Sequence, residues 1–324
     1  PGLLCEPDNA VPRSEARAFA ERHAGWIEDW VAFAGGDALA DQVRVDREWQ
    51  ALRAYARHRG IRVIGDVPIY VAGDGCDHRA HPELFQPVDV VVAGAPPDDL
   101  SDDGQLWGNP LYDWPANARG GYRWWIARMR RALELADMFR IDHFRGFAAY
   151  WAVPAGDETA RGGHWEQGPG AALFDAAESA LGPLPVIAED LGVITPDVVA
   201  LRDALGFPGM AIMLWSFGGP ADNPHRLANH RVNQVVYTST HDMSTLAGAL
   251  PGADVWRIVE QALSSRASLA VIPVQDVLGL GDEAQMNHPG EVGPQNWTWR
   301  LEPGQLSLAH AARLRAAAEA ARRA

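Results

Sequence analysis

The sequence of 324 residues contains no lysine, so all 28 of its basic residues are arginines. This absence excludes a Schiff-base lysine, a pyridoxal phosphate site, a P-loop lysine and the ATP-binding lysine of a kinase. There are only two cysteines, Cys5 and Cys76, and they are far apart in the sequence. A disulfide framework and a CxxC zinc site are therefore excluded, and we expect a cytoplasmic location.

The sequence has few positive charges and no long apolar run. Asp and Glu total 42, which leaves a net charge of −14. No segment approaches the roughly 20 apolar residues that a membrane span needs. Because a negative surface repels nucleic-acid phosphates and anionic lipids, we expect neither nucleic acid nor membrane as a partner. The 47% of hydrophobic residues indicates a large buried core.

Strand-like runs alternate with segments of helical period. We predict strands within residues 61–71, 138–142, 185–190, 210–217, 234–240 and 268–278. Helices are predicted over residues 13–33, 46–59, 122–136, 171–181 and 255–266, with two more beginning near residues 195 and 307. The segment 73–118 is predicted as a long loop. The alternation favours one parallel sheet with helical crossovers, either doubly wound or closed into a barrel.

The positions of the acidic residues favour the barrel. Asp66, Asp142, Glu189, Asp242 and Asp276 each stand at the carboxyl end of a different predicted strand, and a (β/α)₈ barrel gathers its active site at that face. No GxGxxG follows a strand, as a doubly wound nucleotide-binding fold would have.

Six strands are two short of a closed barrel. We therefore expect an α/β protein with a TIM (β/α)₈-type barrel that lacks its first two β/α units. We further expect a single catalytic domain over residues 1–324, truncated at its N-terminus, with the 73–118 loop inserted. The oligomeric state cannot be predicted from these patterns.

Several strand-end residues could perform acid/base chemistry. Arg140 and Asp142 are two positions apart on a strand, so their side chains share a face and the guanidinium keeps the carboxylate ionised. Glu189 follows three apolar residues, a setting that raises a carboxyl pKa. Asp242 follows His241. Three carboxylates, an arginine and a histidine suggest acid/base work at an acetal.

The structural alternatives stay open for each residue taken alone. A strand-end Asp commonly caps a helix or forms an ion pair, and His143 and His241 could be structural histidines. The run DDLSDDG that begins at Asp98 lacks the oxygen spacing of an EF-hand loop, so we interpret it as a solvated loop.

Six segments, in this order, resemble one enzyme family. They closely resemble the 4-α-glucanotransferases, also called amylomaltases or disproportionating enzymes, which form glycoside hydrolase family 77 in the α-amylase clan. The resemblance extends from about Glu15 to Leu301. The segments are RVIGDVPIYVA, PPDDLSDDGQLWGNPLYDW, FRIDHFRGFAAYWAVPAG, IAEDLGVITPDV, VVYTSTHD and PVQDVLGLGDEAQMN with the later NWTWRL.

The resemblance implies a role for each matching residue. Asp142 corresponds to the nucleophile, Glu189 to the acid/base, Asp242 to the transition-state stabiliser and Arg140 to the arginine beside the nucleophile. The residues implied to contact glucose units are Asp66, Trp107, His143, His241 and Asn287. It also implies a retaining reaction on malto-oligosaccharide or on glucan derived from starch or glycogen, with no cofactor and no metal.

The sequence departs from the family pattern in ways that keep two alternatives open. Leu100 stands where the family usually has an aromatic residue, and Met243 and Ala249 follow the THD motif where Asn and Trp are common. If water reached the covalent intermediate, the protein would be an α-glucan hydrolase. If the site were incomplete, the chain would be an inactive truncated homologue.

Overall fold

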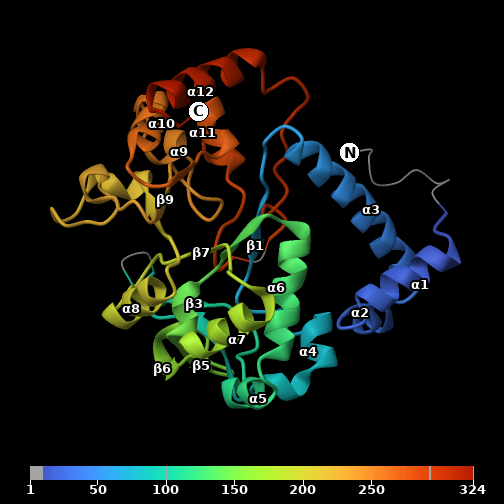
Figure 1. The fold of residues 1–324 in the computed structure, drawn as a ribbon. Coiled ribbons are helices and arrows are strands. Elements are labelled where there is room, and N and C mark those ends of the chain that lie inside the picture. Colours follow the sequence, from blue (N-terminus) through green and yellow to red (C-terminus); the bar gives the residue numbers. More distant parts are fainter. Residues whose placement is uncertain (1–9, 99–100, 292, 324) are drawn as a thin grey trace. The chain divides into compact units, whose positions relative to one another are not determined.

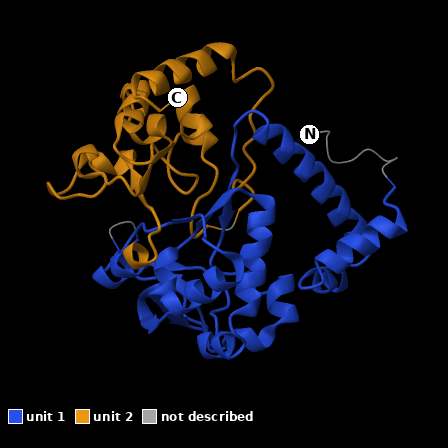
Figure 2. Cartoon of the chain, viewed as in Figure 1, with its two compact units in different colours: residues 1–201 blue, residues 202–324 orange. Residues whose placement is uncertain are grey.

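The structure of the chain is a computed structural model that describes residues 10–98, 101–291 and 293–323. It divides into two compact units, residues 1–201 and 202–324 (Figure 2). Each unit has its own parallel sheet, and we describe the two separately. The single catalytic domain over residues 1–324 stays a prediction. Leu100 and Cys5 lie outside the described residues.

The first unit is built on a three-stranded parallel sheet (Figure 1). Its strands, in the order in which they pair, are β1 (Ile64–Val67), β4 (Met138–Ile141) and β7 (Val186–Ala188). The helices α6 (Arg123–Leu135) and α7 (Ala171–Leu181) precede β4 and β7 along the chain, as parallel pairing requires. Every residue of β7 is buried, which is typical of a strand covered on both faces.

A cluster of large aromatic side chains fills the core of the first unit. Burial of each such side chain contributes about 2–3 kcal/mol to stability, so this cluster firmly holds the turn that follows β4. Its fully buried members include Tyr112, Trp125, Phe139, Phe144, Phe147 and Phe174.

The predicted loop over residues 73–118 is wrong. This segment contains α4 (Cys76–Ala80), β2 (Val91–Ala95), β3 (Gln105–Leu106) and α5 (Trp114–Arg119). The strands β2 and β3 belong to an antiparallel sheet of order β3-β2-β5-β6 with β5 (Ala149–Pro154) and β6 (His164–Gln167).

Glycine explains why the sequence pattern does not predict this antiparallel sheet. A Cβ atom at Gly94 in β2 would lie 2.5 Å from the carbonyl oxygen of Gln105 in β3 and 2.9 Å from a methyl carbon of Val153 in β5. The close approach of the strands therefore requires glycine. The glycines that permit this sheet are the same residues that suggest a loop in the sequence.

Three helices begin the described chain. The predicted helix over 13–33 is divided into α1 (Arg13–Arg22) and α2 (Ile27–Ala34) by a turn that contains Gly25, and α3 (Ala38–Arg57) begins eight residues before its predicted start. Glycine costs about 1 kcal/mol inside a helix, which favours a break at this turn.

Ion pairs attach α3 to the loop between α6 and β4. Arg53, which is 3% exposed, donates hydrogen bonds to the carbonyl oxygen of Glu134 and, at 2.8 Å, to Oδ1 of Asp137. Arg57 donates to the same Oδ1 atom at 2.6 Å. The backbone N–H of Val63 and then the Arg57 side chain hold the pKa of Asp137 well below its usual range, although burial opposes them.

The second unit contains the other three predicted strands. They are parallel, in the order β10 (Leu269–Val271), β9 (Gln234–Tyr237) and β8 (Gly209–Ile212). The helix α8 (Pro196–Ala204) precedes β8 along the chain, and α9 (Leu246–Ala249) follows β9. All six predicted strands are thus present, but they form two sheets of three instead of one sheet of six. The prediction of a single sheet is wrong on this point because a sequence pattern identifies strands and not the strands they pair with.

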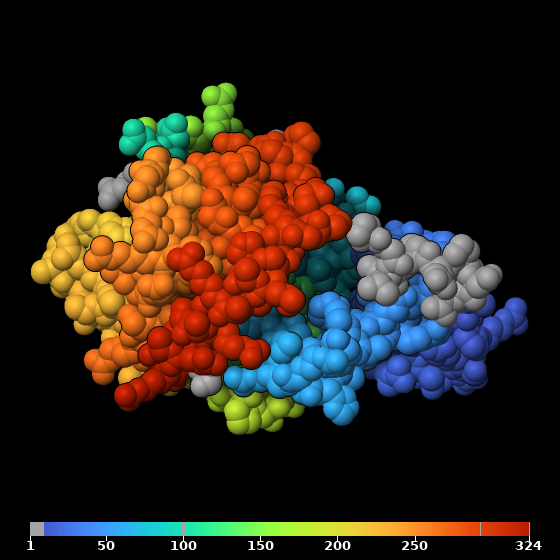
Figure 3. All heavy atoms as spheres, turned by 90° about the horizontal axis from the view of Figure 1, so that it is seen from above, coloured from blue at the N-terminus to red at the C-terminus, as the bar shows by residue number. Residues whose placement is uncertain are grey.

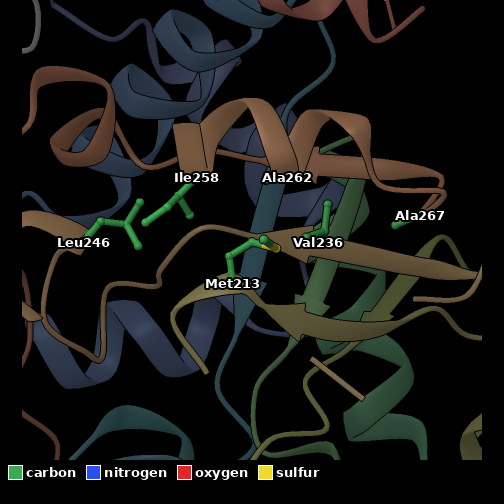
Figure 4. Packing of buried hydrophobic residues seen from close by; sticks show 6 residues of the cluster. All are labelled: Met213, Val236, Leu246, Ile258, Ala262 and Ala267. Atoms are coloured by element: carbon green, nitrogen blue, oxygen red, sulfur yellow. The ribbon is translucent and has the colours of Figure 1, made fainter. Parts of the chain in front are cut away.

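The helix α10 (Val255–Ser264) covers the sheet of the second unit. Figure 4 shows Ile258 and Ala262 on this helix facing Met213 and Val236 below it. The C-terminal helix α12 (Leu308–Ala320) has no buried residue, and its red atoms are visible on the surface in Figure 3. None of the described helices combines the length and the apolar character that crossing a bilayer requires.

The prediction that Asp276 ends a strand is wrong. The strand β10 stops at Val271, and Asp276 lies in α11 (Val274–Leu278), which begins after Pro273. Proline has no N–H to donate to a strand ladder, and the apolar run 268–278 changes from strand to helix at this point. Asp276 is fully buried and accepts hydrogen bonds from Thr238, Ser239 and the N–H of Leu246.

Candidate active site

Arg140 joins two of the predicted site carboxylates in the first unit. Asp66 lies opposite Arg140 in the pairing of β1 with β4, and the guanidinium donates three hydrogen bonds to its carboxylate, the shortest at 2.7 Å. Arg140 Nη2 also donates to Oδ1 of Asp142 at 2.9 Å. The shared face predicted for Arg140 and Asp142 is confirmed.

Two neighbouring carboxylates keep the Arg140 side chain positively charged. Its side chain is 8% exposed. Burial acts to lower the pKa of the guanidinium, but the carboxylates of Asp66 and Asp142 outweigh it and raise the pKa above the ordinary value. The arginine therefore stays positive and stabilises negative charge on both partners.

Glu189 differs from Arg140 because its environment favours the neutral form of the side chain. It follows β7 directly and is half-buried. Burial, followed by the negative charge of Asp142, raises the pKa of Glu189 to about 8. The positive charge of Arg140 and two backbone N–H donors oppose that rise. The donors are His143, at 2.6 Å from Oε2, and Leu191, at 2.9 Å from Oε1. A carboxyl group in this state is protonated at neutral pH and can donate its proton.

The main chain fixes the spacing of these groups. The N–H of Asp142 donates to the carbonyl oxygen of Val67, and the N–H of Glu189 donates to that of Ile141. The ends of β1, β4 and β7 are thus linked by direct hydrogen bonds. Asp142 and Glu189 occupy the first position after neighbouring parallel strands, as the strand-end pattern predicts.

His143 and Trp107 extend this group of residues. The His143 ring meets Trp107 edge to face, with centroids 4.8 Å apart, and its centroid is 6.3 Å from that of Tyr70. Burial and the charge of Arg145 lower the pKa of His143 to about 3, so the ring is neutral.

Two buried polar atoms lie in this region. Nε2 of His143 and the hydroxyl of Tyr70 have no hydrogen-bond partner among the described residues. A Cβ atom at Gly146 would lie 2.7 Å from Ile69 and 3.5 Å from the Tyr70 hydroxyl, so the side chains around this glycine are closely packed. Tyr70 was not singled out in the sequence, although it belongs to the same motif as Asp66.

The remaining predicted site residues form a cluster in the second unit. Asp242 lies in the loop after β9, and its Oδ1 accepts a hydrogen bond of 2.6 Å from Nδ2 of Asn287. Nε2 of His241 is 3.0 Å from its Oδ2. The N–H of Asn287 donates to the carbonyl oxygen of His241 at 3.0 Å. Asn287, predicted to contact glucose, therefore also holds Asp242 in place.

The structure thus brings the predicted residues together in two sets. The set in the first unit consists of Asp66, Trp107, Arg140, Asp142, His143 and Glu189. The set in the second unit consists of His241, Asp242 and Asn287. Among the residues that the structure describes, no group of three or more His, Cys, Asp or Glu side chains could hold a metal ion.

Comparison with known proteins identifies a family. The sequence profile of a family described as 4-alpha-glucanotransferase matches residues 38–254 and 249–307. The chloroplastic/amyloplastic 4-alpha-glucanotransferase of Arabidopsis thaliana is 47% identical over 287 residues, which cover 81% of this chain and 50% of that protein. The 4-alpha-glucanotransferase of Thermus thermophilus is 42% identical over 96% of this chain and 75% of its own length. The chain spans about half the length of the plant relatives it matches.

Solved structures agree with the sequence comparison. The amylomaltase from Streptococcus agalactiae, determined in complex with acarbose, superposes with a TM-score of 0.82 and 30% identity over 95% of this chain and 71% of that one. The amylomaltase from Corynebacterium glutamicum has a TM-score of 0.78 at 19% identity, covering 95% of this chain and 57% of its own, and supports the fold alone.

Proposed function

Because this chain belongs to the 4-alpha-glucanotransferase family, glycoside hydrolase family 77, we propose that it transfers an α-1,4-glucan segment to the 4-hydroxyl of an acceptor glucan or glucose. The reaction is a retaining double displacement. The substrate class is malto-oligosaccharide or glucan derived from starch or glycogen. The observation that carries the proposal is the contrast between a charged Asp142 paired with Arg140 and a neighbouring Glu189 whose pKa is raised to about 8.

In the first step, the Asp142 carboxylate attacks the anomeric carbon of the donor glucan. Glu189 gives its proton to the glycosidic oxygen, the bond between that oxygen and the anomeric carbon breaks, and the shortened glucan leaves. A glucosyl ester on Asp142 results. Arg140 keeps Asp142 ionised before the attack through its 2.9 Å hydrogen bond.

The second step reverses the protonation of Glu189. Esterification removes the negative charge of Asp142, which is one of the two causes that raise the Glu189 pKa. The pKa of Glu189 therefore falls, and its carboxylate accepts the proton of the acceptor's 4-hydroxyl as that oxygen attacks the ester's anomeric carbon. The same residue acts as acid and then as base because its neighbour's charge changes between the steps.

We assign Asp242 the role of stabilising the positive charge that develops in the transition state. Its two oxygen atoms are occupied by Asn287 and His241, which supports a fixed orientation of the carboxylate. Asp66, Trp107, His143, His241 and Asn287 are proposed to contact glucose units. The edge-to-face contact of His143 with Trp107 supports assigning both residues to this group.

The finer features of fold and location are part of the same proposal. The parallel strands and the amylomaltase neighbours support a TIM (β/α)₈-type barrel. The near absence of cysteine supports a cytoplasmic location, which fractionation of the native source would test.

Incubation of the purified chain with maltotriose tests the reaction. Transfer yields glucose and maltopentaose, and then longer chains, whereas an α-glucan hydrolase yields only shorter products. We expect Asp142→Asn and Glu189→Gln to lose at least about 1,000-fold in kcat. Near-full activity of either variant would contradict the assigned roles, and no turnover by a folded wild-type chain would contradict the function.

A further inference from the structure

Trp297 is held in an unusual backbone conformation beside His241. Its φ angle is 62°, in the left-handed region that a bulky side chain rarely adopts. The described part of the chain contains four such non-glycine residues, and another of them is His143 of the first unit's set. Strained residues of this kind persist where the surrounding structure forces them, and they concentrate at functional sites.

Hydrogen bonds on both sides hold this conformation. The N–H of Trp297 donates to the carbonyl oxygen of Met286 at 2.7 Å, next to Asn287. The side chain of the preceding residue, Asn296, accepts the N–H of His288 at 3.0 Å and donates to the carbonyl oxygen of Glu291 at 2.8 Å. Arg300 donates to the carbonyl oxygen of Trp297 itself at 2.9 Å. The segment therefore keeps the left-handed residue in place.

The result of this constraint is an indole ring that faces solvent. Trp297 is 52% exposed, although tryptophan gains more than most residues from burial. Its ring lies 5.2 Å from the His241 ring, and His241 contacts Asp242. The fold thus places an exposed aromatic ring next to His241, which in turn contacts the Asp242 carboxylate. Packing of the core does not account for an indole that is 52% exposed.

We propose that Trp297 is a stacking platform that positions a glucose unit of the glucan beside Asp242. The C–H groups on one face of a glucose ring form a flat apolar surface, which the face of an indole matches in size. The proposal rests on the proposed function and adds a positioning residue to it. All the groups that carry it lie in the second unit.

Two substitutions distinguish a role of the indole ring from a role of the backbone conformation at Trp297. Trp297→Phe keeps an aromatic face but remains unfavourable at positive φ, whereas Trp297→Asn suits the left-handed backbone and removes the ring. If the ring binds sugar, the Phe variant keeps most of its affinity and the Asn variant loses about five- to tenfold. If Trp297 only shapes the segment, the order is reversed.

The experiment is calorimetric titration with maltotriose in a Glu189→Gln background, which prevents turnover. Leu308→Ala, at a residue 90% exposed on α12, is the matched control and should bind like the parent. In the wild-type background, we expect Trp297→Asn to raise KM for maltotriose with little change in kcat, because stacking contributes to ground state and transition state alike.

The outcomes distinguish this inference from the proposed function. Equal affinity of the parent and Trp297→Asn, with transfer activity intact in the wild type, overturns the stacking role alone. Loss of maltotriose affinity in Trp297→Phe, with affinity retained in Trp297→Asn, also overturns the stacking role. Trp297 would then act through its backbone conformation. If the parent binds no maltotriose and the wild type transfers no glucan, the proposed function fails and the inference fails with it.

Discussion

Raising the pH tests the role of Glu189, because only its protonated carboxyl can act as the general acid. Burial and the charge of Asp142 raise its pKa from the ordinary 4.5 to about 8. At pH 7 a carboxyl with a pKa of about 8 is about 90% protonated, whereas one with a pKa of about 4.5 is only about 0.3% protonated. The environment of Glu189 therefore increases the protonated fraction of its carboxyl group by roughly 300-fold at pH 7.

The assay is kcat/KM for glucose release from maltotriose, measured from about pH 5 to about pH 10 at constant ionic strength. Activity that requires a protonated Glu189 is lost as the pH rises through its pKa. We expect a plateau that ends near pH 8 and then a fall of about tenfold per pH unit. Circular dichroism over the same range should show that the chain stays folded.

A fall in kcat/KM that begins below about pH 6 would refute the argument, because Glu189 would then be ionised at neutral pH. The cause can be tested separately in Asp142→Asn, which removes the nearby negative charge without changing the side chain's size. Carbon NMR of labelled glutamate carboxyls should report a lower pKa for Glu189 in this variant. An unchanged pKa would mean that the Asp142 charge has no part in the shift.

Three further predictions concern residues that hold the structure around these groups. Asp276→Ala removes a fully buried carboxylate that accepts three hydrogen bonds; it should lower the free energy of unfolding by at least about 3 kcal/mol, and urea denaturation with an unchanged midpoint would contradict this. Arg53→Met removes one of two arginines bound to Asp137; we expect a loss of about 2 kcal/mol in the same assay, and a stabilised variant would show that the ion pair is unfavourable. Asn287→Ala removes the amide that donates to Oδ1 of Asp242; kcat for maltotriose should fall about 10- to 100-fold, whereas an effect on KM alone would assign Asn287 to substrate binding only.

The sequence predicted the arrangement of residues at the strand ends because that part depends on short-range geometry. Residues two apart on a strand must share a face, so the pairing of Arg140 with Asp142 follows from spacing alone. A carboxyl that follows three apolar residues of a buried strand must lose water, so the raised pKa of Glu189 follows as well. The third partner of this group, Asp66, is more than 70 positions before Arg140, and only strand pairing brings them into contact.

The parts that escaped prediction depend on contacts that a sequence pattern does not show. The antiparallel sheet needs glycine at Gly94 because another strand approaches closely there, and a sequence pattern cannot tell such a glycine from one in a loop. Trp297 lies in the NWTWRL segment of the family resemblance, but that segment does not show its backbone conformation or its neighbours. Its strained backbone and its position beside His241 arise from hydrogen bonds with residues 286–300, which only the folded chain reveals.

Asp242 and Asp276 show how the environment divides two carboxylates that look alike in the sequence. Each is predicted to stand at the end of a strand in the C-terminal half. Asp276 is fully buried, and a hydrogen bond from Leu246 and two hydroxyl donors occupy it, so it has no face left for a substrate. Asp242 is 30% exposed at its side chain. A carboxylate can stabilise charge on a substrate only if the substrate can reach it. The exposure of Asp242 therefore supports its proposed role toward the sugar, while Asp276 ties α11 to the loop after β9.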